Sequence, residues 1–525
     1  MAGAVQAEKI IGQWWVPLKG TLRGLPPYAL PEDALYDSLN VVVRAGAVIP
    51  RPGLTKFDPT VLGGRPVGAF STTEIATGAF QEDAFQNDAF QIVGNTPTSV
   101  LLVITPTTVW TFWGGIWHDI TGTPLTGQES AFARATSIQI GTTINVIITN
   151  GSDTPQVWDS VAATVSPLAG SPPKWTDITT ASDRIIGIVP PYLVRWGNSL
   201  DLTTWPSANF RSLGDTVDPV VAVRNLGTLG VVVYKQRSIW IGSPNGVTDA
   251  TYFSFSIRGF WDGPASPAAV VDVDGANYYM TDTGRMAYFD GTQHEWIGDG
   301  VWPAVQDELD QPNSGRIFGV FEPTNREVYF YYPRTGDGGA CRGMAIIKVP
   351  RPAEGIPQPI AFRGLSSIPL SCGTDTRLDT RRALVLGDAT QIAYTIEGAN
   401  DDGTNFAGFF QPGFVAVPGL DPYRLEGFEV FCERGIGYGT LTPKVVSNNL
   451  LEAPDTASNV AAQVINLAEI VPQQPEGADV TGKFFALRFE FLTPITLKWY
   501  GARLAARRIE PGIPIQSART LRMTA

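Results

Sequence analysis

The sequence predicts an all-β protein whose largest part is a β-propeller, and three observations lead to this prediction. Short runs of β-branched and aromatic residues recur, as in residues 231–246 (VVVYKQRSIWIGSPNG), which we expect to form a hairpin. Gly and Pro occur 55 and 41 times among 525 residues, which suits a chain with many tight turns. Turn residues recur with the strand pairs every 37 to 49 residues, close to the length of a four-stranded propeller blade.

Residues 1–65 are predicted to form an N-terminal arm that includes a hairpin. Residues 31–39 begin with a proline followed by acidic residues, which predicts one short helix. Residues 40–43 and 47–49 flank Ala45-Gly46 and are predicted to pair as a hairpin. Trp14 and Trp15 have two possible roles: they pack on a neighbouring subunit, or they cover the edge of the chain's own core.

Residues 66–400 are predicted to form the propeller, with six or seven blades. The turn residues that mark successive strand pairs are Gly114, Gly151, Asn198, Gly246, Gly291, Gly338 and Gly387. A pair of stacked β-sandwiches is the competing architecture. Within this range, residues 78–91 (GAFQEDAFQNDAFQ) place Phe at every fifth position, a period that fits neither helix nor strand. We interpret this segment as a loop or sheet edge anchored by its Phe residues.

Residues 401–510 are predicted to form an antiparallel β-sandwich, followed by a C-terminal tail at 511–525. Residues 425–433 (LEGFEVFCE) and 484–492 (FFALRFEFL) alternate between apolar and polar positions, as strands with one buried face do. Residues 495–500 are predicted to add another strand.

The composition excludes some classes of function. The net charge of −12 argues against binding nucleic acid through one strongly basic surface, but not against a channel through which DNA slides. Cys341, Cys372 and Cys432 form no paired motif and predict reduced thiols. The chain contains no apolar run near 18 residues and does not begin like a secretion signal, so we expect no membrane-spanning segment.

The sequence marks no catalytic, cofactor-binding or metal-binding residues, so we predict that the protein is not an enzyme and needs no cofactor. His118 and His294 lie outside any metal-ligand motif and are interpreted as structural residues at blade edges. Acidic pairs such as Asp401 and Asp402 belong to turn sequences. A phosphate-binding loop and a nucleophile elbow are both absent.

A basic cluster near the end of the predicted sandwich is the other candidate site. Arg503, Arg507 and Arg508 lie close to Lys498 in the sequence and could contact phosphate or an acidic partner. The alternative is a solvated strand end. Together with Trp14 and Trp15, the three arginines are our candidate interface residues.

The order of several motifs resembles the nozzle group (tail tubular protein B-like) of β-propeller tail proteins from short-tailed bacteriophages. The resemblance covers most of residues 35–505. The motifs are, in order, DSLNVVVRAGAVIPRPGLTKF, NVIITNGSDTPQVWD, SDRIIGI with RWGNSLDLTTWP, VVVYKQRSIWIG, YMTDTGRMAYFDG and KFFALRFEF. The arm around Trp14 and Trp15 and the AFQ repeats depart from the family pattern.

The resemblance implies a structural protein of the virion, assembled in the host bacterial cytoplasm and located in the phage tail. It implies a ring of six copies below the head–tail connector, which extends the DNA ejection channel and closes it until infection. The implied partners are other copies of the chain, tail adaptor or portal–connector proteins and tail fibres; DNA would pass without sequence-specific binding. The alternative function is a carbohydrate-binding or carbohydrate-cleaving propeller that recognises a host receptor, and a cellular scaffold propeller is a third possibility.

Overall fold

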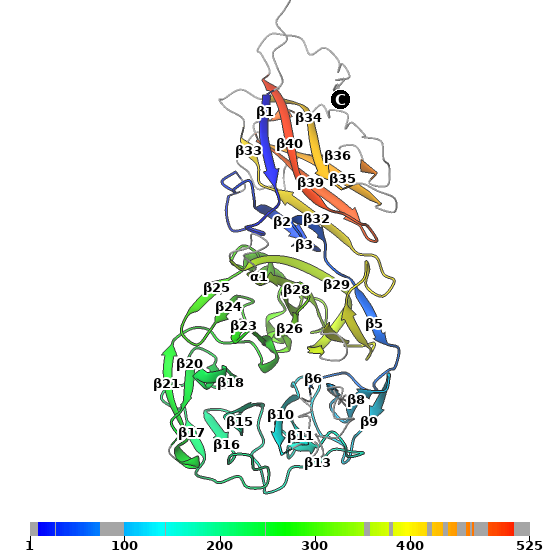
Figure 1. Ribbon diagram of the computed structural model, residues 1–525. Coiled ribbons are helices and arrows are strands. Elements are labelled where there is room, and N and C mark those ends of the chain that lie inside the picture. Colours follow the sequence, from blue (N-terminus) through cyan, green and yellow to red (C-terminus); the bar gives the residue numbers. More distant parts are fainter. Residues whose placement is uncertain are drawn as a thin grey trace, which may run out of the picture.

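Antiparallel β-sheet forms nearly all the regular structure of this protein. The computed structural model describes residues 9–26, 28–73, 99–141, 143–246, 248–350, 358–376, 382–416, 423–433, 439–448, 458–461, 465–466, 481–482 and 484–508. Figure 1 shows two bodies: a ring of small sheets, and above it a second body built from the two ends of the chain. The ring is β-propeller-like, as the sequence predicted. The AFQ repeats and the tail at 511–525 lie outside the described residues.

Five four-stranded sheets follow one another around the ring, and in each sheet the strands pair in sequence order. The first three sheets contain β6 (Gly68–Thr73), β7 (Ser99–Ile104), β8 (Val109–Trp113) and β9 (Ile116–Asp119); β10 (Arg134–Ile140), β11 (Thr143–Thr149), β12 (Gln156–Trp158) and β13 (Ser166–Pro167); β14 (Asp177–Ala181), β15 (Arg184–Val189), β16 (Leu193–Trp196) and β17 (Phe210–Ser212). The next two contain β18 (Val220–Asn225), β19 (Val231–Lys235), β20 (Ile239–Pro244) and β21 (Phe253–Gly259); β22 (Val270–Val273), β23 (Ala276–Met280), β24 (Met286–Phe289) and β25 (His294–Ile297).

A seven-stranded sheet closes the ring. It contains β26 (Phe318–Glu322), β27 (Glu327–Pro333), β28 (Cys341–Lys348), β29 (Ile360–Thr376), β30 (Arg382–Gly387), β31 (Ala393–Ile396) and β5 (Leu54–Asp58). The first part of β29 pairs with β28, and its last part pairs with β30. Each pairing contains one register shift, between Cys341 and Gly343 and between Leu370 and Cys372. Since β29 also contacts β6, it joins the two ends of the series of sheets. The N-terminal strand β5 completes the outer edge of this last unit.

The second body, which we call the two-sheet body, combines strands from both ends of the chain. One sheet contains β1 (Lys9–Trp15), β3 (Val41–Arg44), β4 (Ala47–Pro50), β34 (Tyr423–Cys432), β38 (Thr481–Gly482) and β40 (Trp499–Arg508). The other contains β2 (Leu35–Leu39), β32 (Ala407–Pro412), β33 (Val415–Ala416), β35 (Thr440–Asn448), β36 (Ser458–Ala461), β37 (Ile465–Asn466) and β39 (Phe484–Leu492).

An aromatic core holds the two sheets of this body together. The Phe410 ring on β32 stacks on Phe489 of β39, with ring centroids 4.9 Å apart. Both rings contact Trp499 from the opposite sheet, at 5.2 and 5.7 Å. Along β39, Phe485, Leu487, Phe489 and Phe491 are buried as predicted, and Arg488 and Glu490 on the other face are partly exposed. Ala486, also on that other face, is buried against Phe414. Burial of the inner face supplies most of the stabilisation of such a sheet pair.

Most predicted strand pairs are confirmed, and two details differ. Residues 41–44 and 47–50 form the predicted hairpin as β3 and β4. In residues 231–246, β19 and β20 pair as predicted, but they are the two middle strands of their sheet. The strand predicted at 495–500 begins only at Trp499, because residues 495–498 lie outside any strand.

The helix predicted at residues 31–39 is wrong. Residues 31–34 are irregular and Leu35–Leu39 is the strand β2, which pairs with β32. The pairing partner lies far away in the sequence, so a local helix signal carried no information about it. The helices of the described residues are α1 (Trp302–Glu308) and the 3₁₀ turns η1 (Gly227–Leu229), η2 (Asp249–Thr251), η3 (Pro267–Ala269) and η4 (Gln311–Arg316). None of them is long and apolar enough to cross a membrane.

A buried ionic network connects the first strands of neighbouring ring sheets. The Asp177 side chain on β14 is fully buried. Its Oδ1 accepts a hydrogen bond from Arg134 Nε on β10 at 3.0 Å, and its Oδ2 accepts from Arg224 Nη1 on β18 at 2.5 Å and from Val223 N at 2.9 Å. One carboxylate therefore joins three successive sheets.

We predict that Asp177→Asn lowers the free energy of unfolding by about 3–5 kcal/mol, because it removes the buried carboxylate that contacts both Arg134 and Arg224. Urea denaturation at neutral pH measures the change. Asp215→Asn is the matched control: the Asp215 side chain is 67% exposed in its ion pair with Arg211, so the expected change is below about 0.5 kcal/mol. Equal stability of D177N and D215N would contradict the role of this network.

Candidate functional site on the two-sheet body and at its junction with the ring

The structure brings the candidate interface residues from the two ends of the chain onto neighbouring strands. β1 pairs with β40, which places Trp15 opposite Gly501 and Gln13 opposite Arg503. On the other side of β40, β34 places Phe431 opposite the same glycine. The Trp15 and Phe431 rings stack across it, with centroids 6.3 Å apart and planes at 15°. A Cβ at Gly501 would lie 2.6 Å from the Trp14 carbonyl oxygen, so the close approach requires glycine here.

Trp14 and Trp15 lie on opposite sides of their sheet and have different surroundings. Trp14 is 2% exposed, belongs to the core of the two-sheet body, and donates a hydrogen bond from Nε1 to the Gly413 carbonyl at 3.0 Å. Trp15 is 45% exposed on the outer side of the same sheet. Trp14 therefore covers the chain's own core, and Trp15 is the one that a neighbouring molecule could contact.

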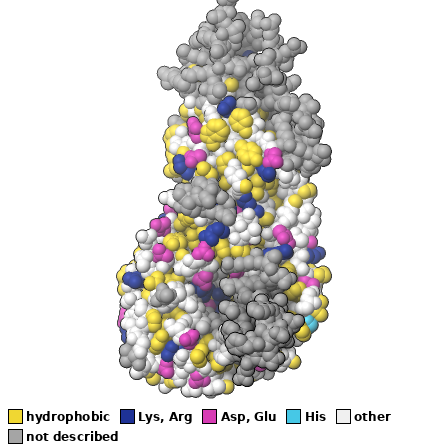
Figure 2. Space-filling model, viewed as in Figure 1, with side chains coloured by type: hydrophobic (Ala, Val, Ile, Leu, Met, Phe, Trp, Pro, Cys, Tyr) yellow, Lys and Arg dark blue, Asp and Glu magenta, His cyan; other side chains and the backbone are white. Residues whose placement is uncertain are grey.

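The predicted basic residues are spread along β40 and the residue just before it. The Arg503 guanidinium carbon lies 5.1 Å from the centre of the Phe431 ring, within the range of a cation–π contact. Lys498 forms an ion pair with Glu433 at 2.8 Å. Arg507 and Arg508 end the strand, opposite Arg424 and Tyr423. In Figure 2, hydrophobic side chains gather on the described part of this body, with basic and acidic side chains beside them.

A second polar cluster, which the sequence did not single out, joins the two bodies. Arg51 follows β4, and its side chain is 1% exposed. Its guanidinium forms two hydrogen bonds with the Asp401 carboxylate, at 3.0 and 2.7 Å, and donates from Nε to Asn40 Oδ1 at 2.9 Å. It also donates to the Leu365 carbonyl on β29 at 2.7 Å and lies 3.8 Å from the centre of the Phe406 ring. This arginine thereby contacts both the ring and the two-sheet body.

Asn40 completes this cluster through its backbone and its amide. Its φ is 58°, in the left-handed region that asparagine tolerates better than most residues. Its Oδ1 accepts from Leu365 N at 2.7 Å, and its Nδ2 donates to the Ala407 carbonyl at 2.7 Å. Next along the chain, Gly53 passes so close to Asn400 that a Cβ there would lie 1.9 Å from the carbonyl oxygen. Asn40, Arg51 and Gly53, which occur in the motif DSLNVVVRAGAVIPRPGLTKF, therefore each make a contact at the junction of the two bodies.

Two further arginines connect strands of the two-sheet body to the ring. Arg44 on β3 donates two hydrogen bonds to Glu327 on β27, at 2.8 and 2.7 Å. Burial opposes the charge of Arg44, yet the hydrogen bond to Glu327 raises its pKa above the ordinary value. Arg363 on β29 contacts Asp37 on β2 at 3.1 Å and Glu308 on α1 at 2.7 Å.

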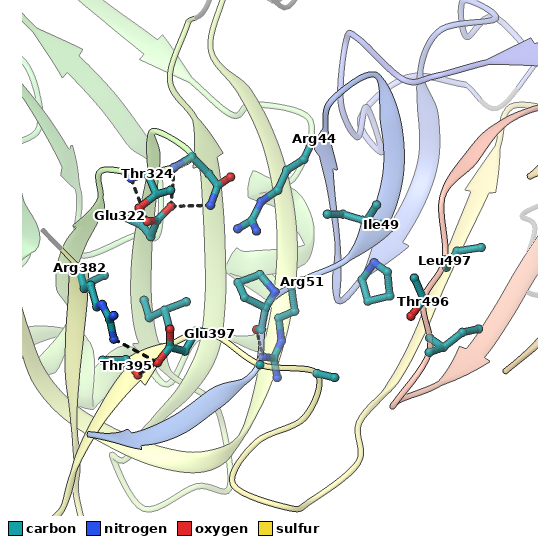
Figure 3. A pocket seen from close by; sticks show the side chains of 18 of the residues that line it. Arg44, Ile49, Arg51, Glu322, Thr324, Arg382, Thr395, Glu397, Thr496 and Leu497 are labelled. Atoms are coloured by element: carbon teal, nitrogen blue, oxygen red, sulfur yellow. Dashed lines mark hydrogen bonds and ion pairs between the residues drawn. The ribbon is translucent and has the colours of Figure 1, made fainter. Parts of the chain in front are cut away.

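A cavity of about 480 Å³ lies at this junction, beside Arg44 and Arg51. Figure 3 shows its lining: Ile49 from the N-terminal strands, Glu322 and Arg382 from the ring, and Leu497 from the segment before β40. The charged side chains that line it have partners of opposite charge or backbone donors; Glu322, for example, accepts from Thr324 N at 2.9 Å and Asn325 N at 2.8 Å. The charged side chains of the cavity are therefore already engaged in contacts within the chain.

Both histidines lie on outermost strands of ring sheets, as predicted: His118 on β9 and His294 on β25. His294 Nε2 shares a hydrogen bond with the Tyr279 hydroxyl at 2.8 Å, and its ring stacks on Trp261 at 4.5 Å. Burial, with a smaller effect of the Arg285 charge, lowers the pKa of His294 to about 4. A histidine with this lowered pKa, stacked on Trp261 and edge-on to Trp296, acts as a packing residue.

The described residues include no metal-ligand cluster, and two of the cysteines are deeply buried. No group of three or more His, Cys, Asp or Glu residues within the described ranges could hold a metal ion. Cys341 and Cys372 are free and buried, and burial raises the pKa of Cys372 to about 12, which suppresses thiolate formation.

No protein-family model matches this chain, and no curated protein matches it either. Among solved structures, the chain is similar to BamB from Moraxella catarrhalis, with 13% sequence identity, a TM-score of 0.33, and coverage of 56% of this chain and 90% of BamB. It is also similar to the computationally designed Ika8 protein, with 13% identity, a TM-score of 0.37, and coverage of 74% of this chain and 100% of Ika8. Likenesses this weak carry no argument about function.

We predict that Arg51→Gln lowers the free energy of unfolding by about 3–5 kcal/mol, because Asp401 then remains buried without its counter-charge. Lys56→Gln is the control: Lys56 is 45% exposed in its ion pair with Asp402, and an exposed pair contributes about 0–1 kcal/mol. Urea denaturation of both variants measures the difference. If R51Q unfolded at the same urea concentration as K56Q, the junction would not depend on this ion pair.

We predict a pH-dependent contribution from His294 to stability. Its pKa is lowered from 6.5 to about 4 in the folded protein, so the unfolded chain binds the proton more readily. The stabilisation is present above pH 6.5 and is lost as the pH falls from 6.5 toward about 4. In His294→Gln, the decrease of Tm over this window should be smaller than in the native protein. Thermal melts across the window test this, and parallel curves would refute it.

Proposed function

We propose that this chain is a structural protein of a bacteriophage tail, the nozzle that extends the DNA ejection channel below the head–tail connector. It would act without catalysis, in a ring of several copies, and its place would be the virion. The observation that carries the proposal is the position of the sequence motifs within the fold.

Four of the motifs that resemble the nozzle family fall at equivalent places in four successive ring sheets. NVIITNGSDTPQVWD spans β11 and β12; SDRIIGI with RWGNSLDLTTWP spans β15 and β16; VVVYKQRSIWIG spans β19 and β20; YMTDTGRMAYFDG spans β23 and β24. In every case these are the second and third strands of a four-stranded sheet. Chance similarity would not select one pair of strands repeatedly, which supports a shared architecture.

The remaining two motifs lie where the chain ends meet. The motif DSLNVVVRAGAVIPRPGLTKF contains β2 to β5 and includes both Asn40 and Arg51 of the junction. The motif KFFALRFEF leads into β39, whose buried face forms the core of the two-sheet body. The motifs thus correspond to buried strands and to the contacts between the bodies, which supports the proposal that the family likeness is one of fold.

We further propose that the ring is a seven-bladed propeller and that the two-sheet body is a β-sandwich. The seven-stranded sheet would supply two blades that share β29, and β5 would close the last blade. Such closure would make the ring depend on an N-terminal strand, β5, pairing with β31 more than 300 residues later. A rigid unit of this kind suits a component that must withstand packaged DNA, with adaptor proteins and tail fibres as its neighbours.

Deletion of the corresponding gene in a phage that encodes this chain tests the proposal. We expect particles that have filled heads but no lower tail, and that lose DNA protection from nuclease. Supplying the chain in trans should restore both, and images of the restored particles should show a ring of its copies. Nuclease-resistant, infectious particles without the chain would refute the proposal.

A further inference from the structure

The outer strands of the ring sheets differ in length, and β21 is the longest of them. The outer strands β9, β13, β17 and β25 contain 4, 2, 3 and 4 residues, whereas β21 contains 7. The outer strand of the closing sheet, β5, is shorter than β21 and carries Lys56 and Asp58. Native proteins shorten or charge their outer strands, because unpaired main-chain groups can bind another strand. On the rim of the ring in Figure 1, β21 is therefore the exception.

The pairing of β21 shows which of its main-chain groups point away from the sheet. Within the described part of the chain, β21 pairs with β20 alone. Asn245 N donates to the Tyr252 carbonyl at 2.8 Å, and Phe253 lies opposite Pro244, which has no N–H to donate. Because bonded and non-bonded positions alternate in an antiparallel pair, alternate residues of β21 turn their N–H and C=O groups outward. These residues are Phe253, Phe255 and Ile257.

The side chains of β21 leave room for another strand beside it. Residues 253–257 (FSFSI) include no charged residue and no proline. On one side, Phe253 and Phe255 contact the Trp196 ring, with centroids 5.5 and 6.2 Å apart, and the intervening serines on the other side are exposed. An added strand would continue both sides, with alternate side chains beside Phe255 and the others in solvent. It would therefore alternate between apolar and polar residues.

We propose that β21 binds an extended segment of another protein, which adds to the fourth ring sheet as a fifth strand. In this mode of recognition, main-chain hydrogen bonds supply affinity and alternate side chains supply selectivity. A helix could not replace the strand, because its main-chain groups bond within the helix. Pairing of two copies of β21 would bring together two chains that each have a net charge of −12, which repulsion opposes. The inference concerns the ring sheet alone and does not depend on the proposed function.

A displayed library of random linear peptides, selected on the full-length chain, tests this inference. We expect enriched peptides that alternate between apolar and polar residues. Hydrogen–deuterium exchange of the complex should show slower exchange at the outward amides of Phe253, Phe255 and Ile257. N-methylation of one alternate set of peptide amides should weaken binding about tenfold or more, because it removes the hydrogen bonds to β21. Methylation of the intervening amides should leave binding nearly unchanged.

Ile257→Pro and Ile257→Thr form a matched pair of variants. Ile257 is 37% exposed, and proline is tolerated on an outer strand where the N–H faces solvent, so both variants should fold, which circular dichroism checks. I257P removes one outward donor and should weaken peptide binding, whereas I257T keeps that donor and should bind like the native chain.

Four outcomes would overturn the inference. They are the absence of enriched peptides, protection from exchange elsewhere than β21, equal effects of the two methylation patterns, and equal binding by I257P and I257T. Sedimentation velocity adds a fifth: self-association of the native chain that I257P abolishes would make a second copy the occupant of this edge, in place of another protein.

Discussion

The buried ion pair between Arg51 and Asp401 is the constraint on which the arrangement of the two bodies depends. Both side chains are removed from water, which costs several kcal/mol per charge unless every donor and acceptor is satisfied. Arg51 meets that requirement through Asp401, Asn40 and the Leu365 carbonyl. These partners come from both bodies, so displacing one body relative to the other would leave charges buried without partners. The junction is therefore fixed in a single geometry.

The ring depends on the same kind of constraint. Asp177 connects the first strands of three sheets, and β29 and β5 join the end of the series to its beginning. Apolar packing between neighbouring sheets is non-directional and tolerates small shifts, whereas a carboxylate held by two arginines does not. The combination gives a closed ring with defined spacing between its sheets.

The two-sheet body has aromatic residues on both its inner and its outer faces. It unites N-terminal strands with strands up to β40, so it forms only after β40 has been synthesised. Its inner faces supply the aromatic core around Phe410 and Trp499, and its outer faces present Trp15 with Phe431 and Tyr28 with Phe484. The two kinds of surface follow from one rule, the alternation of side chains along a strand.

The sequence by itself determined the all-β class, the recurring strand pairs and the alternation along β39, because these are set by neighbours within a few residues. It also placed Trp15 and Arg503 among the candidate interface residues. It failed at residues 31–39, where pairing of β2 with a distant strand decided the structure. Only the tertiary structure decided that Trp14 is buried while Trp15 is exposed, and that Arg51 meets Asp401. Those outcomes depend on contacts between residues hundreds of positions apart, for which a local pattern carries no physical signal.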